Sequence, residues 1–135
     1  EMSGAIGIEQ LKKLPSFLSQ RKKNSVLFNQ LFKNDNRFYI QEEIGESSWF
    51  GFSFIIKNDI DRNHLIKKLT ENNIESRPIV TGDFTKNEVI KYFDYEIHDE
   101  LVNSKLLDSN GFFVGNSQED LTDELYHLNK VLKKI

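Results

Sequence analysis

The chain has 135 residues, of which 38% are hydrophobic and 12% aromatic, and this is enough for one domain with a single core. Its 18 basic and 21 acidic residues give a net charge of -3 with both signs mixed, so no nucleic-acid partner is expected. The absence of cysteine excludes disulfides, a thiol nucleophile and cysteine-ligated zinc. The apolar runs are too short to span a bilayer, so the sequence predicts a soluble protein without a membrane partner.

Residues 3–32 predict a long amphipathic helix. Apolar side chains recur three and four positions apart between Ile8 and Phe32. Pro15 is expected to kink or divide the helix. The basic side chains of its polar face, such as Arg21 and Lys22, are interpreted as a solvated surface in preference to an anion-binding site.

A hairpin and a second helix are predicted next. Residues 38–44 and 49–57 have strand character around a Gly-Glu-Ser-Ser turn. The alternating Phe50, Phe52 and Phe54 are interpreted as a packed core face, although such a stripe could also hold a ring-shaped ligand. Residues 61–72 then predict a helix that packs Leu65, Ile66 and Leu69, with Asp59 or Asp61 as its N-cap.

The second half of the chain contains shorter elements. A strand is expected from Arg77-Pro78, followed by a short helix or turn over residues 86–95 that seats the intervening loop against the core. A small helix near residues 100–107, a turn at Asn110-Gly111, a buried strand over 112–114 and a final amphipathic helix complete the chain. Ser117 and Asp120 resemble a capping box for that helix. The order of elements predicts an α+β fold, mainly an antiparallel sheet with flanking helices.

The segment 77–87 has the composition of a binding loop. Arg77 offers a fork of donors for phosphate or carboxylate, Pro78 stiffens the backbone, and Gly82 permits a close approach. An ordinary surface loop with a solvated arginine fits the same residue types equally well. The residues predict no metal site and no nucleophile with a base, and Asp83 could meet His98 only if the loop folds back.

Three motifs carry a resemblance to a known family. The opening Glu-Met-Ser-Gly-Ala-Ile-Gly-Ile-Glu-Gln-Leu-Lys-Lys-Leu resembles the segment after the cofactor domain of DegT-type sugar aminotransferases. Arg-Pro-Ile-Val-Thr-Gly-Asp-Phe-Thr-Lys-Asn (77–87) and Gly-Phe-Phe-Val-Gly-Asn (111–116) resemble the branch with CDP-4-keto-6-deoxyglucose 3-dehydrases and related lipopolysaccharide-biosynthesis enzymes. Asp83 departs from that branch, which usually has Asn there, so a donor and acceptor group is replaced by a pure acceptor.

This resemblance implies that residues 1–135 form the C-terminal small domain of a longer fold-type I enzyme. Such an enzyme binds pyridoxal phosphate or pyridoxamine phosphate in its cofactor domain, which is absent from residues 1–135. The resemblance also implies a cytoplasmic homodimer that dehydrates or aminates a nucleotide-linked 4-keto-6-deoxy sugar. Arg77 is then expected to bind phosphate or sugar, while Gly82, Asp83 and Phe84 shape the loop, and His98 is a weaker candidate for substrate contact. The segment alone is expected to be inactive.

Two other hypotheses fit the same α+β pattern. The first is a stand-alone module that binds a small ligand on its sheet, and the second is a dimerisation module without a ligand. Ligand binding by the isolated chain separates the first from the second, and an in-frame cofactor domain upstream separates the enzyme from both.

Overall fold

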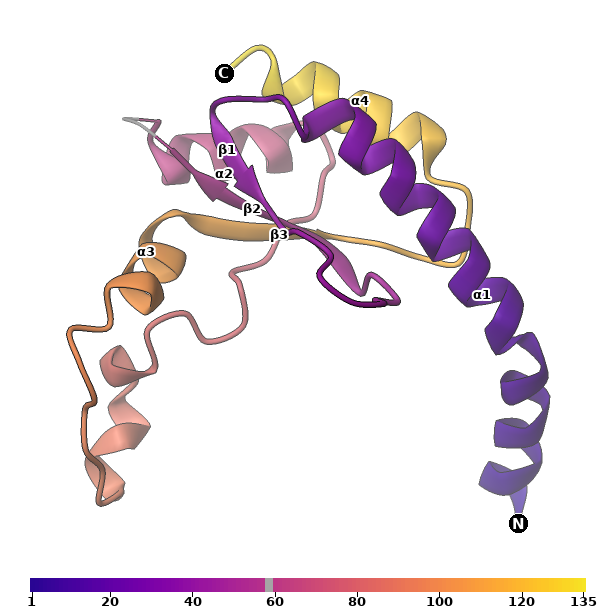
Figure 1. Ribbon diagram of the computed structural model, residues 1–135, viewed down its shortest axis with the longest axis horizontal. Helices are drawn as coiled ribbons and strands as arrows, with labels where there is room; N and C mark the ends of the chain where they lie inside the picture. The colour runs from indigo at the N-terminus through magenta and orange to yellow at the C-terminus, as the bar shows by residue number, and fades with distance from the viewer. Residues whose placement is uncertain (58–59) are drawn as a thin grey trace.

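The computed structural model describes residues 1–57 and 60–135, and its elements confirm the predicted α+β class. Within these residues, three strands form an antiparallel sheet in the order β1-β2-β3, with four α-helices and two short 3-10 helices around it (Figure 1). The elements are α1 (Met2–Phe32), β1 (Phe38–Ile40), β2 (Gly51–Ile56), α2 (Arg62–Glu71), η1 (Phe84–Lys86), η2 (Glu88–Tyr92), α3 (Val102–Asn110), β3 (Gly111–Gly115) and α4 (Thr122–Leu132).

The core lies between one face of the sheet and the helices α1, α2 and α4. Phe28 of α1 stacks on Phe52 of β2 with 4.5 Å between ring centroids, and Phe54 stacks on Phe112 of β3 at 5.0 Å. Such offset aromatic pairs add to the hydrophobic stabilisation of the buried rings. The predicted core positions Leu65 and Leu69 of α2 and Leu125, Leu128 and Leu132 of α4 are all buried in this cluster.

No helix of the described residues covers the other face of the sheet (Figure 1), and Phe50, which was predicted for the core, lies on that face. Phe52 and Phe54 are fully buried, as expected, but Phe50 is 74% exposed. Phe50 precedes Gly51, the first residue of β2, so it lies outside the alternation that buries Phe52 and Phe54, and it follows Trp49, whose backbone is left-handed with a φ of 50°. Phe50 therefore lies beside Phe113 on the open face, with 6.3 Å between the ring centroids.

Helix α1 is continuous through Pro15, so the predicted division of this helix is not found. Only its second half reaches the core, where Phe28 and Phe32 are buried, whereas residues 1–16 are all exposed. Figure 1 shows this first half projecting away from the sheet. No helix within the described residues combines the length and apolar character that crossing a membrane requires.

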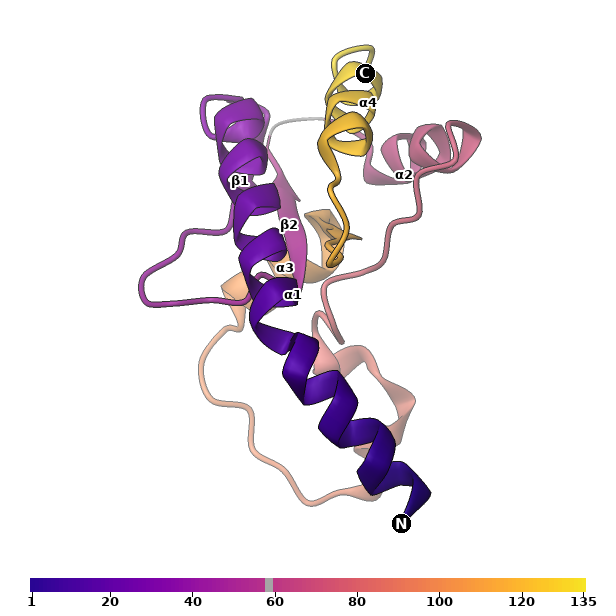
Figure 2. The same cartoon turned by 90° about the vertical axis from the view of Figure 1, so that its right-hand side faces the viewer.

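Residues 79–101 form a second projection, which we call the arm. The strand expected from Arg77 is wrong, because Arg77 makes only an isolated bridge to Phe113 and the chain then turns at Ile79 to Gly82. The short helix expected within residues 86–95 is present as η2 and is preceded by η1, but it does not pack on the core: Ile90 is buried within the arm, while Tyr92 is 85% exposed. Figures 1 and 2 show the arm and the first half of α1 extending on the same side of the core.

Three local predictions concern helix ends. Asp61 is the N-cap of α2, as predicted, since its carboxylate accepts a hydrogen bond from the Asn63 amide at 2.8 Å, whereas Asp59 lies outside the described residues. The capping box at Ser117 is wrong, because α4 begins only at Thr122. The turn at Asn110-Gly111 is also wrong, since α3 leads directly into β3 through an extended Gly111.

Candidate functional site

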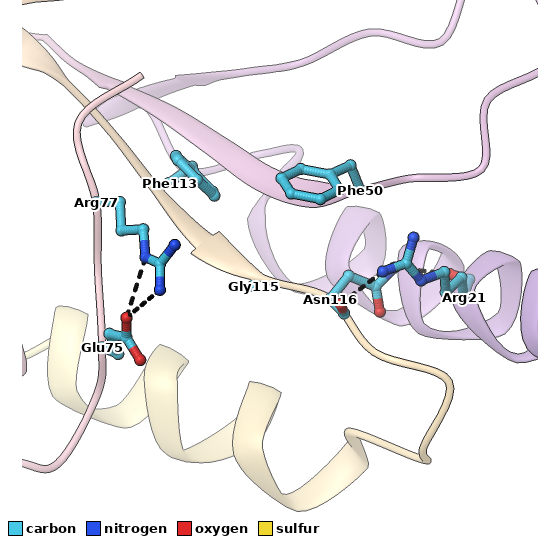
Figure 3. A pocket seen from close by; sticks show the side chains of 7 residues that line it. All are labelled: Arg21, Phe50, Glu75, Arg77, Phe113, Gly115 and Asn116. Atoms are coloured by element: carbon cyan, nitrogen blue, oxygen red, sulfur yellow. Dashed lines mark hydrogen bonds and ion pairs between the residues drawn. The ribbon is translucent and has the colours of Figure 1, made fainter. Parts of the chain in front are cut away.

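A cavity of about 350 Å³ lies where the open face of the sheet meets α1 and the segment after α2 (Figure 3). We call it the two-arginine pocket, because two guanidinium groups line it. Figure 3 shows Arg77 and Arg21 on opposite sides, with the rings of Phe50 and Phe113 between them. Its lining residues are Arg21, Phe50, Glu75, Arg77, Phe113, Gly115 and Asn116.

Arg77 is held in the pocket by its backbone. Its amide donates to the Phe113 carbonyl at 2.9 Å, and the Phe113 amide donates back to the Arg77 carbonyl at 2.8 Å. The next residue, Pro78, has no amide to continue a ladder, which explains why the pairing stops after one bridge. The side chain of Arg77 is therefore fixed at its base.

The guanidinium of Arg77 already has a carboxylate partner. Its Nε and Nη2 atoms donate to Oε1 of Glu75 at 3.0 and 2.8 Å. The two side chains are 69% and 77% exposed, so solvent screens this ion pair and it contributes little to stability. An anionic ligand would therefore share Arg77 with Glu75, and Glu75 adds an acceptor suited to hydroxyl or N–H groups.

Arg21 was not predicted as a site residue. It was interpreted as part of a solvated helix face, yet its Nη2 atom donates to the carbonyl of Asn116 at 3.2 Å and its side chain lines the pocket. One signal in the sequence could have found it: Asn24 lies four residues before Phe28 on the core-facing side of the same helix. A polar residue at such a position indicates a buried hydrogen-bond network.

That network connects α1 to the end of β3. The Asn24 amide group donates to Oδ1 of Asn116 at 3.0 Å and to the carbonyl of Glu119 at 2.8 Å. The Asn116 amide group donates to the carbonyls of Trp49 at 2.9 Å and of Arg21 at 3.2 Å. Asn24 and Asn116 are only 3% and 7% exposed, so these bonds are shielded from water.

The predicted loop residues Gly82, Asp83 and Phe84 lie on the arm and do not line the two-arginine pocket. Gly82 has a φ of +55°, which confirms the need for glycine there. The carboxylate of Asp83 is 3% exposed and accepts hydrogen bonds from the amide and hydroxyl of Thr85, at 3.1 and 2.6 Å. Asp83 therefore caps η1, and its carboxylate is engaged within its own loop.

The loop is tied to α3 by an exposed ion pair. Nζ of Lys86 donates to Oδ2 of Asp108 at 2.6 Å. This hydrogen bond lowers the pKa of Asp108 and raises the pKa of Lys86. It holds the loop of Gly82 against α3, where Gly82 packs on Asp108.

A second cavity, of about 410 Å³, lies within the arm. His98, Asp83 and Phe84 all line this cavity, so the loop folds back towards His98. Such folding back was the condition predicted from the sequence for Asp83 to meet His98. No hydrogen bond between Asp83 and His98 is found among the described residues. Within the same part of the chain, no cluster of three or more acidic or histidine side chains could hold a metal ion.

The two-arginine pocket combines guanidinium donors, one carboxylate and two aromatic rings, which is the chemistry of a site for an anionic ligand that carries a ring. Neither it nor the arm cavity is lined by a lysine of the described residues, so they offer no amine for a Schiff base with pyridoxal phosphate. Fold and pocket together define a small α+β domain with a cavity lined by two guanidinium groups, one carboxylate and two aromatic rings.

Sequence comparison identifies the family. Residues 1–130 match the DegT/DnrJ/EryC1/StrS aminotransferase family, and the chain belongs to it. The chain is 57% identical to GDP-4-keto-6-deoxy-D-mannose 3-dehydratase of Escherichia coli O55:H7 over 98% of its length, and 30% identical to the lipopolysaccharide biosynthesis protein RfbH of Salmonella typhimurium over 99%. It spans about a third of both relatives, 35% and 31% of their lengths. The resemblance to the DegT family and its dehydrase branch is thus confirmed.

Solved structures give the same result. The E. coli GDP-4-keto-6-deoxy-D-mannose-3-dehydratase with bound hydrated pyridoxal phosphate superposes with a TM-score of 0.94 at 56% identity, covering 97% of this chain and 34% of the other. A variant of GDP-4-keto-6-deoxymannose-3-dehydratase with bound GDP-perosamine gives 0.94 at 55% identity, with 97% and 35% covered. The sugar aminotransferase CalS13 of Micromonospora echinospora, at a TM-score of 0.78 and 13% identity over 97% and 34%, shares the fold.

Proposed function

We propose that the chain is the C-terminal domain of an enzyme that uses pyridoxal phosphate or pyridoxamine phosphate to remove the 3-hydroxyl group of a nucleotide-linked 4-keto-6-deoxy sugar. The observation that carries the proposal is the 57% identity to a GDP-4-keto-6-deoxy-D-mannose 3-dehydratase along 98% of the chain. The 30% identity to a lipopolysaccharide biosynthesis protein supports a role in making deoxysugars for lipopolysaccharide. Amination, the reaction that names the family, is the second candidate.

Exposed apolar side chains support a larger neighbour for this domain. They gather on the two projections, and clustered exposed apolar side chains are typical of an interaction surface. A cofactor domain that fills the space between the projections would bury them, and a homodimer in the cytoplasm is part of the proposal. These residues include Met2, Ile6, Ile8 and Leu11 on α1 and Tyr92, Phe93, Tyr95 and Ile97 on the arm, each at least 52% exposed.

The cofactor belongs to that other domain in this proposal. Pyridoxal phosphate supplies an electron sink for bond breaking next to a carbon that bears nitrogen. The present chain would contribute binding: Arg77 contacts the phosphate or sugar of the substrate, with Glu75 as an acceptor for its hydroxyl groups. Gly82, Asp83 and Phe84 would shape the loop that closes one wall of the site, and its tip at Phe84 is 45% exposed and available for contact.

The test uses the full-length protein with pyridoxal phosphate, glutamate and GDP-4-keto-6-deoxymannose, and the sugar product is analysed by mass spectrometry. Loss of the 3-hydroxyl without gain of an amino group is the expected result. Gain of an amino group at the keto carbon would establish amination instead. A full-length protein that binds no cofactor and converts no nucleotide sugar would overturn both.

The two non-enzymatic alternatives are tested on the isolated chain. A stand-alone module would bind a nucleotide sugar without any other domain, and a dimerisation module would form dimers and bind no ligand. The proposal expects neither tight nucleotide-sugar binding nor turnover by the isolated chain, as measured by calorimetry and by product analysis.

A further inference from the structure

Arg21 differs from Arg77 in its electrostatic surroundings. None of the ion pairs formed within the described residues involves Arg21, whereas Arg77 is paired with Glu75. The contact of Arg21 to the carbonyl of Asn116 uses one N–H group, and a guanidinium has five. Arg21 therefore brings a positive charge and several donors to the pocket without being ion-paired to a carboxylate of the described residues.

The position of Arg21 is fixed by a reciprocal contact. The guanidinium of Arg21 donates to the main chain of Asn116, and the side chain of Asn116 donates to the main chain of Arg21, both at 3.2 Å. The side-chain amide of Asn24 in turn holds Asn116, because it donates a hydrogen bond of 3.0 Å to Oδ1 of Asn116. Because both asparagines are buried, this arrangement limits the motion of a long side chain that would otherwise lose much entropy on binding.

We propose that Arg21 is the main anion-binding side chain of the two-arginine pocket, where it takes the diphosphate group of a nucleotide-linked ligand, and that Asn24 and Asn116 position it. Two features of the pocket fit such a ligand: a guanidinium on each side can engage separate phosphate oxygens, and Phe50 and Phe113 offer ring faces between them. This inference rests on the proposed function, which supplies a nucleotide diphosphate sugar as the substrate class.

The first experiment measures binding of GDP and of guanosine to the full-length protein by isothermal titration calorimetry. Arg21→Gln removes the charge, and since Arg21 is only partly buried the variant is expected to fold. We expect it to weaken GDP binding by about tenfold or more, the effect of losing a charge-assisted hydrogen bond, and to leave guanosine binding unchanged. Lys23→Gln is the matched control, since it removes a charge from an exposed position of the same helix turn.

The second experiment tests the positioning role. Asn116→Ala should weaken GDP binding in the wild-type background, but it should add nothing in the Arg21→Gln background, because the asparagine acts through the arginine. In turnover assays, Arg21→Gln should raise KM for the nucleotide sugar and leave kcat unchanged. This is expected because the diphosphate contact stabilises the bound substrate and the transition state equally. If Asn116→Ala does not fold, the Arg21→Gln result still decides the anion-binding role.

The outcomes separate the two proposals. If the wild-type protein binds GDP and Arg77→Gln weakens it while Arg21→Gln does not, the role of Arg21 is refuted and the proposed function stands. Equal weakening of GDP and guanosine by Arg21→Gln also refutes phosphate recognition. If the wild-type protein binds no nucleotide at all, the proposed function fails and this inference fails with it.

Discussion

Replacing Gly82 by alanine tests whether the arm is a unit with its own local stability. Gly82 has a φ of +55°, and an added Cβ would lie 3.0 Å from the Cα and Cβ atoms of Asp108. The substitution therefore introduces two separate strains. Both act on the loop of the proposed substrate wall, and neither touches the core.

The magnitude follows from these two strains. A left-handed conformation costs an alanine about 1–2 kcal/mol, and shifting Asp108 away from the new methyl group adds about 1 kcal/mol. The arm should lose about 2–3 kcal/mol of local stability, which corresponds to roughly 30- to 150-fold faster opening. Since the arm residues lie outside the core cluster, opening the arm alone relieves the strain, so the free energy of global unfolding should fall by no more than the local stability of the arm.

Hydrogen exchange followed by mass spectrometry measures the local effect, and urea denaturation measures the global one. The reporters are the amides of Gly82, Lys86 and Asn87, which donate to carbonyls within the arm at 3.0, 3.1 and 3.0 Å. Exchange at these amides should accelerate, while the core amides of β2 and β3 keep their protection.

Two other glycines serve as controls. Gly111→Ala places a Cβ 2.9 Å from Cδ1 of Ile79 and against the carbonyl of Leu107 at the start of β3, so it should lower the global midpoint. Gly115→Ala has no neighbour within 4 Å and should be silent. The reasoning is refuted if Gly82→Ala lowers the urea midpoint as much as Gly111→Ala does, or if the arm amides exchange at the wild-type rate.

Three further predictions concern strain, pH and helix stability. Val80 has a φ of 47° and is 84% exposed, so Val80→Asn should stabilise the arm by about 0.5–1 kcal/mol, seen as slower amide exchange. The hydrogen bond from Arg37 lowers the pKa of Asp35 in the folded state. Asp35 therefore stabilises the fold at pH values above the ordinary pKa of a carboxyl group, and this contribution should be lost as the pH falls below about 4. In thermal melts recorded at a series of pH values, Arg37→Gln should make the melting temperature fall less steeply below about pH 4. An unchanged pH dependence in this variant would contradict the assignment. Gly4→Ala and Gly7→Ala, at exposed sites in α1 with no neighbour within 4 Å, should each stabilise the helix by about 0.5–1 kcal/mol and raise the ellipticity of the isolated chain.

The parts of the fold that the sequence predicted are those that hydrophobic periodicity governs. The four-residue spacing of Phe28 and Phe32 and the leucines of α4 place buried faces on helices, and these packed as expected. Periodicity failed at Phe50, because this residue precedes the first residue of β2 and follows the left-handed Trp49, so the alternation of the strand does not extend to it. The conformation of Trp49 is supported from outside the strand: Ser47 accepts from the Trp49 amide at 3.0 Å, and Glu43 accepts from its indole nitrogen at 3.1 Å.

The site was predictable only in part, for a related reason. Arg77 was identified because Arg-Pro next to a glycine loop is a local pattern, and local patterns can be read from neighbouring residues. Arg21 enters the pocket through a contact with Asn116, which is 95 residues away in the sequence. No local pattern reports such a contact, and the buried Asn24 shows only that some polar partner must exist.

The left-handed backbone at Trp49 links the fold to the proposed function. Had the alternation of β2 extended to Phe50, this ring would join the core, and the open face near Arg77 would carry one ring instead of two. The side-chain amide of Asn116 donates to the carbonyl of Trp49, so the residue before Phe50 is connected to the residue that we propose positions Arg21. A change in Trp49 should therefore disturb both sides of the pocket at once: Trp49→Ala is expected to weaken GDP binding by the full-length protein more than Phe50→Ala does. Equal losses in the two variants would mean that the pocket needs the second ring and not the conformation at Trp49.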